Sequence, residues 1–467
     1  MAISTAVSDE RISRIVGYQI IKGDFSNVTP NLPQRVAILA EANEANQATL
    51  DLTPKEITSA QQAGTLYGYG SPIYQIMRIL RPVNGGGIGG IQTVVYPQAV
   101  GAAAVAAARE ITPTGTATAS GKHTVVINGR TSIDGQSFDF NVVSGDTPAI
   151  ICDKITAVVN AVLASPVTAV DGTTKVTLTS KWKGLTSEGL NITVNTNSNS
   201  LGVTYAVTSS ATGAVTPSIT DALNLFAENW NTIVINSYGE PVFDALEAFN
   251  GKPDATTPTG RYASIVMKPF IALAGETSET ISDYTDLSAN RTEEVTNAIC
   301  PAPGSDGFKF EAAANVALLF AVKSNNEPHL DVNAMSYPDM PVPTDRVIGD
   351  MSNYETRDIL VKDGVSTVKL VDNKYQIQDF ITTYRPAGET PPQFRYCRNL
   401  MLDFNVRFGY YLLEQINVVD HTIANDADIV AVGNVIKPKQ WKQIIDKYAE
   451  DLGKRALIAD VPLCKNQ

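Results

Sequence analysis

The stretch from Arg357 to Ile416 reads RDILVKDGVSTVKLVDNKYQIQDFITTYRPAGETPPQFRYCRNLMLDFNVRFGYYLLEQI. Its first half has β-forming residues on both sides of Asp372-Asn373, a pair that favours a two-residue turn. Prolines and glycine then break the strand pattern, and apolar residues at helical spacing follow from Leu400 onward. The stretch predicts a β-hairpin followed by a long amphipathic helix. Because a lone hairpin is marginal in water, we expect it to pair with further strands or to pack on that helix.

Two phrases within this stretch are DGVST, from Asp363 to Thr367, and ITTY, from Ile381 to Tyr384. In this order, on a hairpin before a long helix, they resemble the contractile-tail sheath proteins of Mu-like bacteriophages. An ordinary hairpin packed on a helix would also account for both phrases. A third phrase, VTLTSKWKG from Val176 to Gly184, is similar to the same family. The resemblance covers most of the chain and is strongest in 340–455 and 120–240.

Composition limits the classes of function. The chain has 467 residues, which suggests about two to four domains. Its net charge of −12 argues against a partner that is nucleic acid or an anionic membrane, because an acidic surface repels phosphates. The four cysteines are far apart and form no CxxC, which predicts reduced and mostly buried thiols. We see no signal peptide and no apolar run long enough for a transmembrane helix, so no membrane insertion is expected.

The order of elements predicts an α/β core with an inserted, mostly-β domain and an α+β C-terminal domain that contains the hairpin. The resemblance implies a subtilisin-like arrangement for the core. We expect extended arms at both ends. The predicted boundaries are 1–20 for the N-terminal arm, 21–110 and 216–345 for the central domain, 111–215 for the inserted outer domain, 346–453 for the C-terminal domain and 454–467 for the C-terminal arm.

Individual elements follow from periodicity, caps and turn residues. In the central domain we expect strands at Gln34–Ala40, Ile91–Tyr96, Asn231–Asn236, Ala263–Met267 and Thr292–Cys300, and helices at Pro54–Gly64, Pro72–Leu80, Ile219–Glu228, Pro241–Phe249 and Phe308–Lys323. In the inserted domain we expect five strands, at Lys122–Asn128, Phe138–Val143, Lys175–Ser180, Leu190–Val194 and Val203–Thr208, and a helix at Pro148–Leu163. A final helix begins at Pro438 and ends at Gly453, and Ala456–Val461 reads as an edge strand.

A subtilisin-like fold raises the alternative of a hydrolase. Such an enzyme needs a histidine to accept the serine proton and an acid to orient that histidine. The sequence has only His123, His329 and His421, none at a strand end beside a plausible serine and aspartate, and it has no GxSxG. Glycines 85, 87 and 90 match GxGxxG, but a helix precedes them and a strand follows, the reverse of a dinucleotide site. We therefore predict no catalytic residue, no cofactor and no metal site.

The chain ends carry β-formers without enough apolar residues to fold alone. We expect these arms to become strands on the sheet of another subunit, with the hairpin as the acceptor. The predicted arm and edge residues are Ile12, Ile15, Val16, Val365, Val368, Leu370, Tyr375, Ile377, Ile381, Leu457, Ile458 and Val461. Many relatives continue well beyond the last helix, whereas this chain ends sooner, so the way its C-terminal arm engages a neighbour stays open.

The resemblance also implies partners and a location. It implies a helical homo-oligomer of stacked hexameric rings that surrounds a tail tube protein and meets baseplate and tail terminator proteins. Such a sheath is assembled in the bacterial cytoplasm, is part of the virion and contracts to drive the tube through the host envelope. A non-contractile capsid or tube protein is the competing structural class. A tube protein would be shorter and mostly β, which the alternation of strands and helices argues against.

Overall fold

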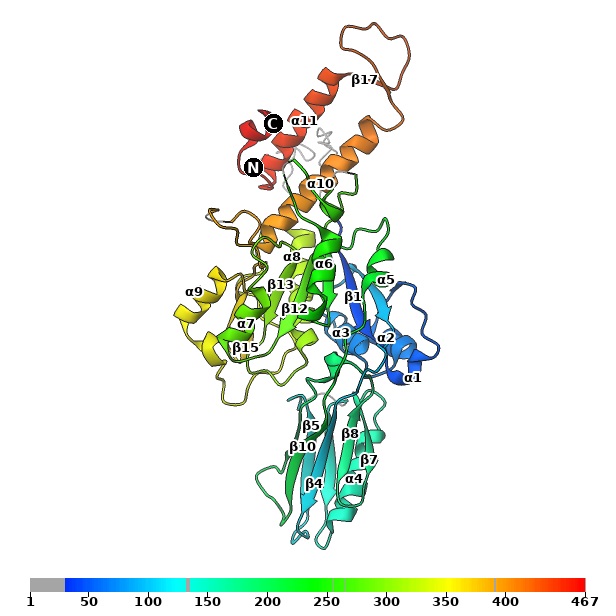
Figure 1. Cartoon of the computed structure of the whole chain (residues 1–467), viewed down its shortest axis with the longest axis vertical. Coiled ribbons are helices and arrows are strands. Elements are labelled where there is room, and N and C mark those ends of the chain that lie inside the picture. Colours follow the sequence, from blue (N-terminus) through cyan, green and yellow to red (C-terminus); the bar gives the residue numbers. More distant parts are fainter. Residues whose placement is uncertain (1–29, 132–134, 255, 264, 390–391, 467) are drawn as a thin grey trace, which may run out of the picture.

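The computed structural model describes residues 30–131, 135–254, 256–263, 265–389 and 392–466. Three parts follow one another along the long axis (Figure 1). An α/β core lies in the middle, the strands of the inserted segment project from one end, and two long helices, α10 and α11, project from the other. Fold class is thus mixed α/β with several separate sheets.

A six-stranded sheet forms the core, in the order β13-β12-β11-β1-β3-β2. All neighbours in it are parallel except β2 and β3. Its strands are β1 (Arg35–Glu41), β2 (Lys55–Glu56), β3 (Gln92–Gln98), β11 (Ile233–Asn236), β12 (Ile271–Glu276) and β13 (Asn297–Pro301). The helices of this part are α1 (Glu44–Gln47), α2 (Ala60–Tyr67), α3 (Pro72–Leu80), α5 (Thr220–Asn224), α6 (Phe243–Asn250), α7 (Ile281–Ser288) and α8 (Lys309–Asn326).

Both faces of this sheet are buried, which explains why β1 reads as a continuous apolar run instead of an alternating one. Val36 and Ile38 pack with residues of α3 and α8 on one face. Ala37 and Leu39 pack with residues of α5 and α6 on the other face. Alternate side chains of a strand point to opposite faces, so one short segment connects the two hydrophobic layers.

The inserted segment forms two small sheets, β10-β4-β8-β7 and β6-β5-β9, with one helix. Its elements are β4 (Ala108–Thr114), β5 (Gly121–Ile127), β6 (Ser137–Val142), α4 (Pro148–Asn160), β7 (Val167–Asp171), β8 (Val176–Ser180), β9 (Ile192–Asn195) and β10 (Thr204–Ala211). The chain enters through β4 and leaves through β10, and these two strands are antiparallel neighbours. The five strands expected from the sequence are present, but β4 and β7 were not predicted.

A buried joint connects the inserted segment to the core. Arg130 of the insertion is 5% exposed, and its guanidinium lies 2.9 Å from the Glu311 carboxylate at the start of α8 and 2.5 Å from Asp339. Arg78 of α3 bonds the other oxygen of Asp339 at 2.8 Å. Beside this cluster, the fully buried ring of Trp182 packs edge-on against Phe308, with ring centroids 5.3 Å apart.

The C-terminal part contains the predicted hairpin and long helix. Its elements are α9 (Tyr354–Lys362), β14 (Thr367–Val371), β15 (Lys374–Asp379), α10 (Cys397–Asn417), β16 (Thr422–Ile423), β17 (Val435–Ile436), α11 (Pro438–Lys454) and α12 (Val461–Asn466). The helix α10 begins beside the core, where Leu400 and Phe404 are buried. Farther along, its outer half pairs with α11 through a smaller apolar cluster.

Two expected elements of the core are wrong. Where a helix was predicted at Pro54–Gly64, the chain forms the short strand β2, and the helix begins only after Ser59, whose hydroxyl accepts a hydrogen bond from the backbone of Gln62. The expected strand Ala263–Met267 is a turn, in which the Ala263 carbonyl accepts two backbone hydrogen bonds. The true strand is β12, a longer apolar run that follows shortly after.

The end of the chain also differs from expectation. Gly453 does not end α11, which continues to Lys454. The run Ala456–Val461 is not a strand, because Ala456 has a left-handed backbone with φ of 56° and the Leu457 amide donates to the Leu452 carbonyl. Asp460 then accepts from the Leu463 amide and starts α12.

Candidate functional site: an open strand edge on the hairpin

The hairpin of β14 and β15 closes through a two-residue turn. Asp372 and Asn373 have φ values of 51° and 58°, the left-handed conformation that Asp and Asn tolerate better than most residues. Val371 pairs with Lys374 on either side of the turn. The turn that the sequence predicted at this dipeptide is therefore present, and it fixes which backbone groups of each strand point out of the hairpin.

Outward-pointing groups alternate along each strand, because every second residue of an antiparallel pair bonds its partner and the others face away. Counting from the closing pair, Val368 and Leu370 face outward on β14, and Tyr375 and Ile377 face outward on β15. The two edges of the hairpin therefore offer different sets of backbone donors and acceptors.

The β15 edge is already occupied by residues 334–337 of the same chain. The Tyr337 amide donates to the Tyr375 carbonyl at 2.8 Å, and the Ile377 amide donates to the Met335 carbonyl at 3.0 Å. The Ile377 carbonyl accepts from the Ala334 amide at 2.8 Å. The sequence proposed Tyr375 and Ile377 as acceptor residues, but the Tyr375 carbonyl and both outward backbone groups of Ile377 are thus already bonded within the chain.

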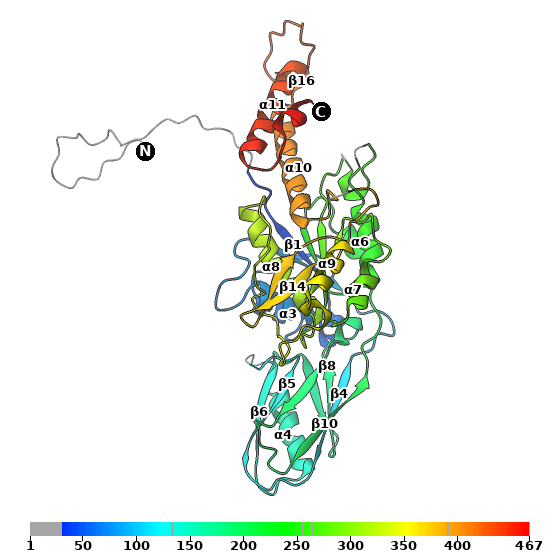
Figure 2. The same ribbon diagram turned by 90° about the vertical axis from the view of Figure 1, so that its left-hand side faces the viewer.

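The β14 edge differs. Within the part of the chain that the structure describes, the amides and carbonyls of Val368 and Leu370 have no backbone partner outside the hairpin. Lys369 between them is exposed, and a lysine on an edge strand discourages unwanted pairing. In Figure 2, β14 lies on the side of the core that faces the viewer. The sequence indicated an open edge on this hairpin; in the structure the outward backbone groups without a partner lie on β14, where Leu370 is partly exposed and Val368 is 1% exposed.

The hairpin is held firmly against the core. The Tyr375 hydroxyl donates to the Pro303 carbonyl at 2.8 Å, and Phe380 packs edge-on against Phe320 of α8, with centroids 5.0 Å apart. The Thr383 amide donates to the Asn297 carbonyl of β13. The hairpin is therefore anchored to both α8 and β13.

The remaining predicted edge residues lie elsewhere. The Val365 amide donates to Leu360, and the Ile381 amide donates to the Ser366 hydroxyl, so neither is on the open edge. Leu457 is buried in the cluster of α10 and α11, with Ile458 packed against it, and Val461 begins α12. The predicted residues of the N-terminal arm, Ile12, Ile15 and Val16, lie outside the described residues.

The described chain starts beside its C-terminal helices. The Leu32 amide donates to the Asn405 side chain of α10 at 2.9 Å, and Arg455, which follows α11, donates to the side chain of Asn31. The described chain therefore begins at the end of the molecule where α10 and α11 project.

One histidine and three cysteines are buried within the fold. His123 is buried, with one ring nitrogen 2.8 Å from the Tyr205 hydroxyl and the other 2.9 Å from the Asn199 carbonyl. Cys152, Cys300 and Cys397 are buried free thiols, and burial raises the pKa of Cys152 to about 11. Among the described residues no cluster of His, Cys, Asp or Glu is suited to hold a metal ion, and no helix is long and apolar enough to cross a membrane.

Comparison with known proteins gives one sequence relative. No family model matches the chain. Over 391 aligned residues it is 23% identical to the Mu-like prophage FluMu tail sheath protein of Haemophilus influenzae. The alignment covers 82% of this chain and 75% of that protein.

Two solved structures align over most of the chain. The sheath tail protein of Desulfitobacterium hafniense aligns with a TM-score of 0.41 and 11% identity, over 94% of this chain and 89% of the other. The sheath of an extracellular contractile injection system, PVC, in its contracted state aligns with a TM-score of 0.40 and 10% identity, over 96% and 85%.

The sequence relative is a tail sheath protein, and in the structure the DGVST phrase leads into β14 while the ITTY phrase follows β15. The chain is therefore similar to tail sheath proteins, with the Mu-like prophage protein as its relative over most of its length. The family indicated by the sequence phrases is thereby confirmed.

Proposed function

We propose that this sheath subunit polymerises as stacked hexameric rings around a tail tube protein, between a baseplate and a tail terminator, and that it contracts to drive the tube through the host envelope. The open backbone edge of β14 is the observation that supports this proposal most directly. Of the two outward-facing residues, Leu370 is partly exposed, whereas Val368 is 1% exposed and would have to be uncovered before a strand from another copy could bond it. A contact between two different surfaces repeats without closing, as stacked rings with helical symmetry require.

In this proposal the N-terminal arm of one subunit pairs with β14 of a neighbour. Main-chain hydrogen bonds join the two sheets, and the linker bends while the rings slide. About twenty extended residues reach roughly 65 Å, which is enough to leave the subunit body. The amides and carbonyls of Val368 and Leu370 allow about four such hydrogen bonds, each of which contributes about 0.5–1.5 kcal/mol before the cost of ordering the arm.

The C-terminal arm is a second candidate donor with a higher cost. Leu457 is buried against α10 and α11, so residues 454–467 would have to leave that cluster before they could pair with another subunit. The free energy of contraction comes from repacked interfaces between subunits, and the extended sheath is kinetically trapped until the baseplate triggers it.

We also propose that residues 111–215 form an outer domain and that the central region has the subtilisin-like arrangement implied by the resemblance. The entry and exit of the insertion through neighbouring strands and the parallel core sheet are compatible with both. The domain boundaries given from the sequence are kept in this proposal, as are the virion location and the host cytoplasm as the place of assembly.

Deletion of residues 2–17 tests the arm. The described core lies outside this segment, so the variant should fold with the melting temperature of the parent and yet form no tubes by negative-stain microscopy. Ile15→Pro should weaken assembly in the same direction, because proline removes one strand donor. If the deletion variant polymerises as well as the parent, the arm is a frayed terminus and globular contacts hold the sheath together.

A further inference from the structure

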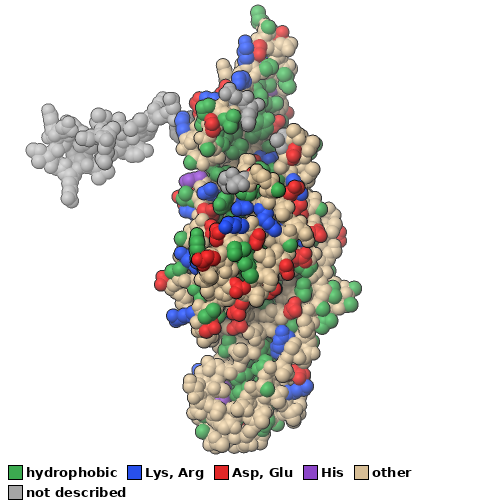
Figure 3. Space-filling view, turned by 60° about the vertical axis from the view of Figure 1, so that its left-hand side comes forward, with side chains coloured by type: hydrophobic (Ala, Val, Ile, Leu, Met, Phe, Trp, Pro, Cys, Tyr) green, Lys and Arg blue, Asp and Glu red, His purple; other side chains and the backbone are tan. Residues whose placement is uncertain are grey.

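Residues 418–436, which we name the tip, connect α10 to α11 at the far end of the molecule (Figure 1). Aliphatic side chains on the tip are unusually accessible: Ile429 is fully exposed, and Ile423 and Val432 are 72% and 70% exposed. Figure 3 shows hydrophobic side chains on this outermost end. Apolar side chains that gather on a projecting loop, instead of lying singly on a surface, mark a place where another molecule docks.

The tip has a defined conformation. The short parallel pair of β16 and β17 closes its base. The Lys437 ammonium donates to the Asp428 carbonyl at 2.5 Å, and the Asp426 carboxylate accepts from the Lys439 amide at 2.9 Å. These bonds tie the tip to the start of α11, so little conformational entropy remains to be lost when the tip binds.

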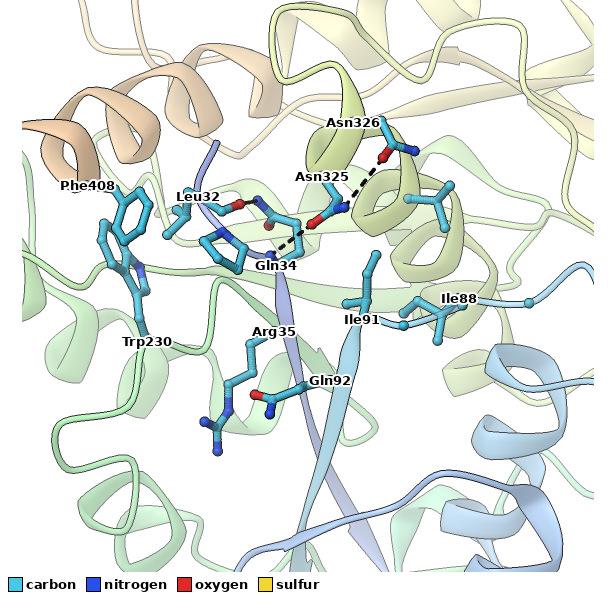
Figure 4. Close-up of a pocket in the computed structure, with 15 residues that line it drawn as sticks. Leu32, Gln34, Arg35, Ile88, Ile91, Gln92, Trp230, Asn325, Asn326 and Phe408 are labelled. Carbon is cyan, nitrogen blue, oxygen red and sulfur yellow. Dashed lines mark hydrogen bonds between the residues drawn. The ribbon is translucent and has the colours of Figure 1, made fainter. Parts of the chain in front are cut away.

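A pocket of about 680 Å³ lies beside the middle of α10, at the edge of the core sheet where β1 and β3 begin (Figure 4). Trp230 and Phe408 form one wall, with centroids 6.2 Å apart, and Ile88 and Ile91 line another part. Carboxamides surround this apolar surface and could bond the backbone of an inserted loop: Gln34, Gln92, Asn325 and Asn326.

The charge of the pocket is distinctive in a chain with a net charge of −12. Among the described residues that line it, Arg35 is the only charged one. The guanidinium bonds Asn229 at 3.0 Å, but its buried Nε has no hydrogen-bond partner among the described residues. An apolar pocket with one incompletely paired guanidinium and several carboxamides fits a loop that carries both aliphatic side chains and carboxylates.

We propose that the tip of one subunit seats in this pocket of a neighbouring subunit. The tip cannot reach the pocket of its own chain, because Phe408 lines that pocket and α10 runs nine residues further, to Asn417, away from the core (Figure 1). Those residues span about 13 Å of rigid helix. The contact joins two different surfaces and therefore extends a helical polymer without closing it.

Charge favours the tip over the N-terminal arm as the occupant. The tip carries Asp420, Asp426 and Asp428 and no lysine or arginine. Residues 1–29 carry three acidic residues that are balanced by Arg11, Arg14 and Lys22. Only the tip therefore brings net negative charge to Arg35, along with exposed aliphatic side chains.

Disulfide trapping tests this contact, which rests on the proposed self-assembly. In a Cys464→Ser background, whose other thiols are buried, Ile429→Cys and Gln92→Cys are combined in one chain. Oxidation of assembled tubes should give disulfide-linked multimers of the double variant and only uncrosslinked chains for each single variant. A matched control pairs Gln92→Cys with Ile265→Cys, which is 93% exposed but lies outside the tip, and should give no multimers.

The outcomes separate this contact from the proposed function. If the tubes form but the double variant gives no more multimers than the control pair, the tip is not seated in the pocket, although the assembly proposal stands. If the parent forms no tubes at all, the proposed function fails first. Ile429→Asp should in addition weaken tube assembly more than Ile265→Asp does, and equal effects would contradict the tip contact.

Discussion

Arg130 shows how one residue can fix the position of a whole segment. Its guanidinium is buried against Glu311 and Asp339, so Arg130→Met would leave two carboxylates with Arg78 as the remaining cation. Removal of one partner from a buried ionic cluster costs about 3–5 kcal/mol of unfolding free energy. Urea unfolding should show a loss of that order. Lys122→Met, which breaks the exposed pair with Asp139, should cost about 0–1 kcal/mol, and equal losses would contradict this account.

Glu41 predicts a dependence of stability on pH. Burial at the end of β1 raises the pKa of its carboxyl from 4.5 to about 8, while Thr186 of the inserted segment donates to it at 3.1 Å. An unfolded chain loses this proton near pH 4.5, so between pH 4.5 and 8 the folded state binds more protons. The contribution of Glu41 to the free energy of unfolding is therefore fully present below pH 4.5 and is lost as the pH rises to about 8.

Glu41→Gln stays neutral at every pH and removes that loss. The variant should therefore gain stability over the parent by roughly 1.4 kcal/mol for each pH unit within this window. Melting temperatures at pH 5 and pH 8 measure the gain. Glu247, whose pKa burial raises to about 7, is present in both proteins and cancels in the difference. A parallel pH dependence of parent and variant would show that Glu41 is ionised in the folded state; Glu44→Gln, at an exposed position, is the control.

Helix-capping and turn preferences predicted the roles of residues that act through neighbours close in sequence. Ser71 caps α3 before Pro72, and Asp372-Asn373 forms the turn, because both depend on contacts a few residues away. Arg130 and Glu41 were not singled out. Their importance depends on partners more than a hundred residues distant, which no cap or periodicity reveals.

At the scale of elements, the open edge of β14 leads to a paired test. Leu370→Pro removes an amide that points out of the hairpin, whereas Lys369→Pro removes one that bonds β15. Leu370→Pro should therefore keep the melting temperature closer to that of the parent than Lys369→Pro does, yet abolish tube formation. Thermal unfolding and microscopy measure the two properties separately. Normal tubes from Leu370→Pro would exclude this edge as an acceptor.

Periodicity predicted the buried strands and long helices well, because their apolar residues follow the period of the element. It failed where the pattern is short or ambiguous, as in β4, β7 and α9. The candidate site was predicted only in part. Residues 334–337 cover the β15 edge without any strand pattern, so the sequence could not tell which edge of the hairpin remains open.

At the scale of the molecule, the buried contacts between insertion and core predict that removal of the insertion lowers the stability of the core. Replacement of residues 111–215 by a short linker deletes Arg130 and Trp182, which leaves Glu311 less compensated and Phe308 uncovered. We expect the shortened chain to fold with a lower melting temperature and still to polymerise. Glu311→Gln should recover part of the stability in the shortened chain and destabilise the full chain. Complete loss of folding in both shortened chains would mean that the insertion is not a separate domain.

Trp182 provides a fluorescence probe of the same joint. Its indole is fully buried against Phe308 and donates to the Thr186 hydroxyl at 3.0 Å. The chain has three tryptophans, so replacement of Trp230 and Trp441 by phenylalanine leaves a single emitter at this boundary. Indole fluorescence moves to longer wavelength when water reaches the ring. The emission maximum of such a variant would therefore follow the separation of insertion and core in real time, during unfolding and during the proposed contraction of the sheath.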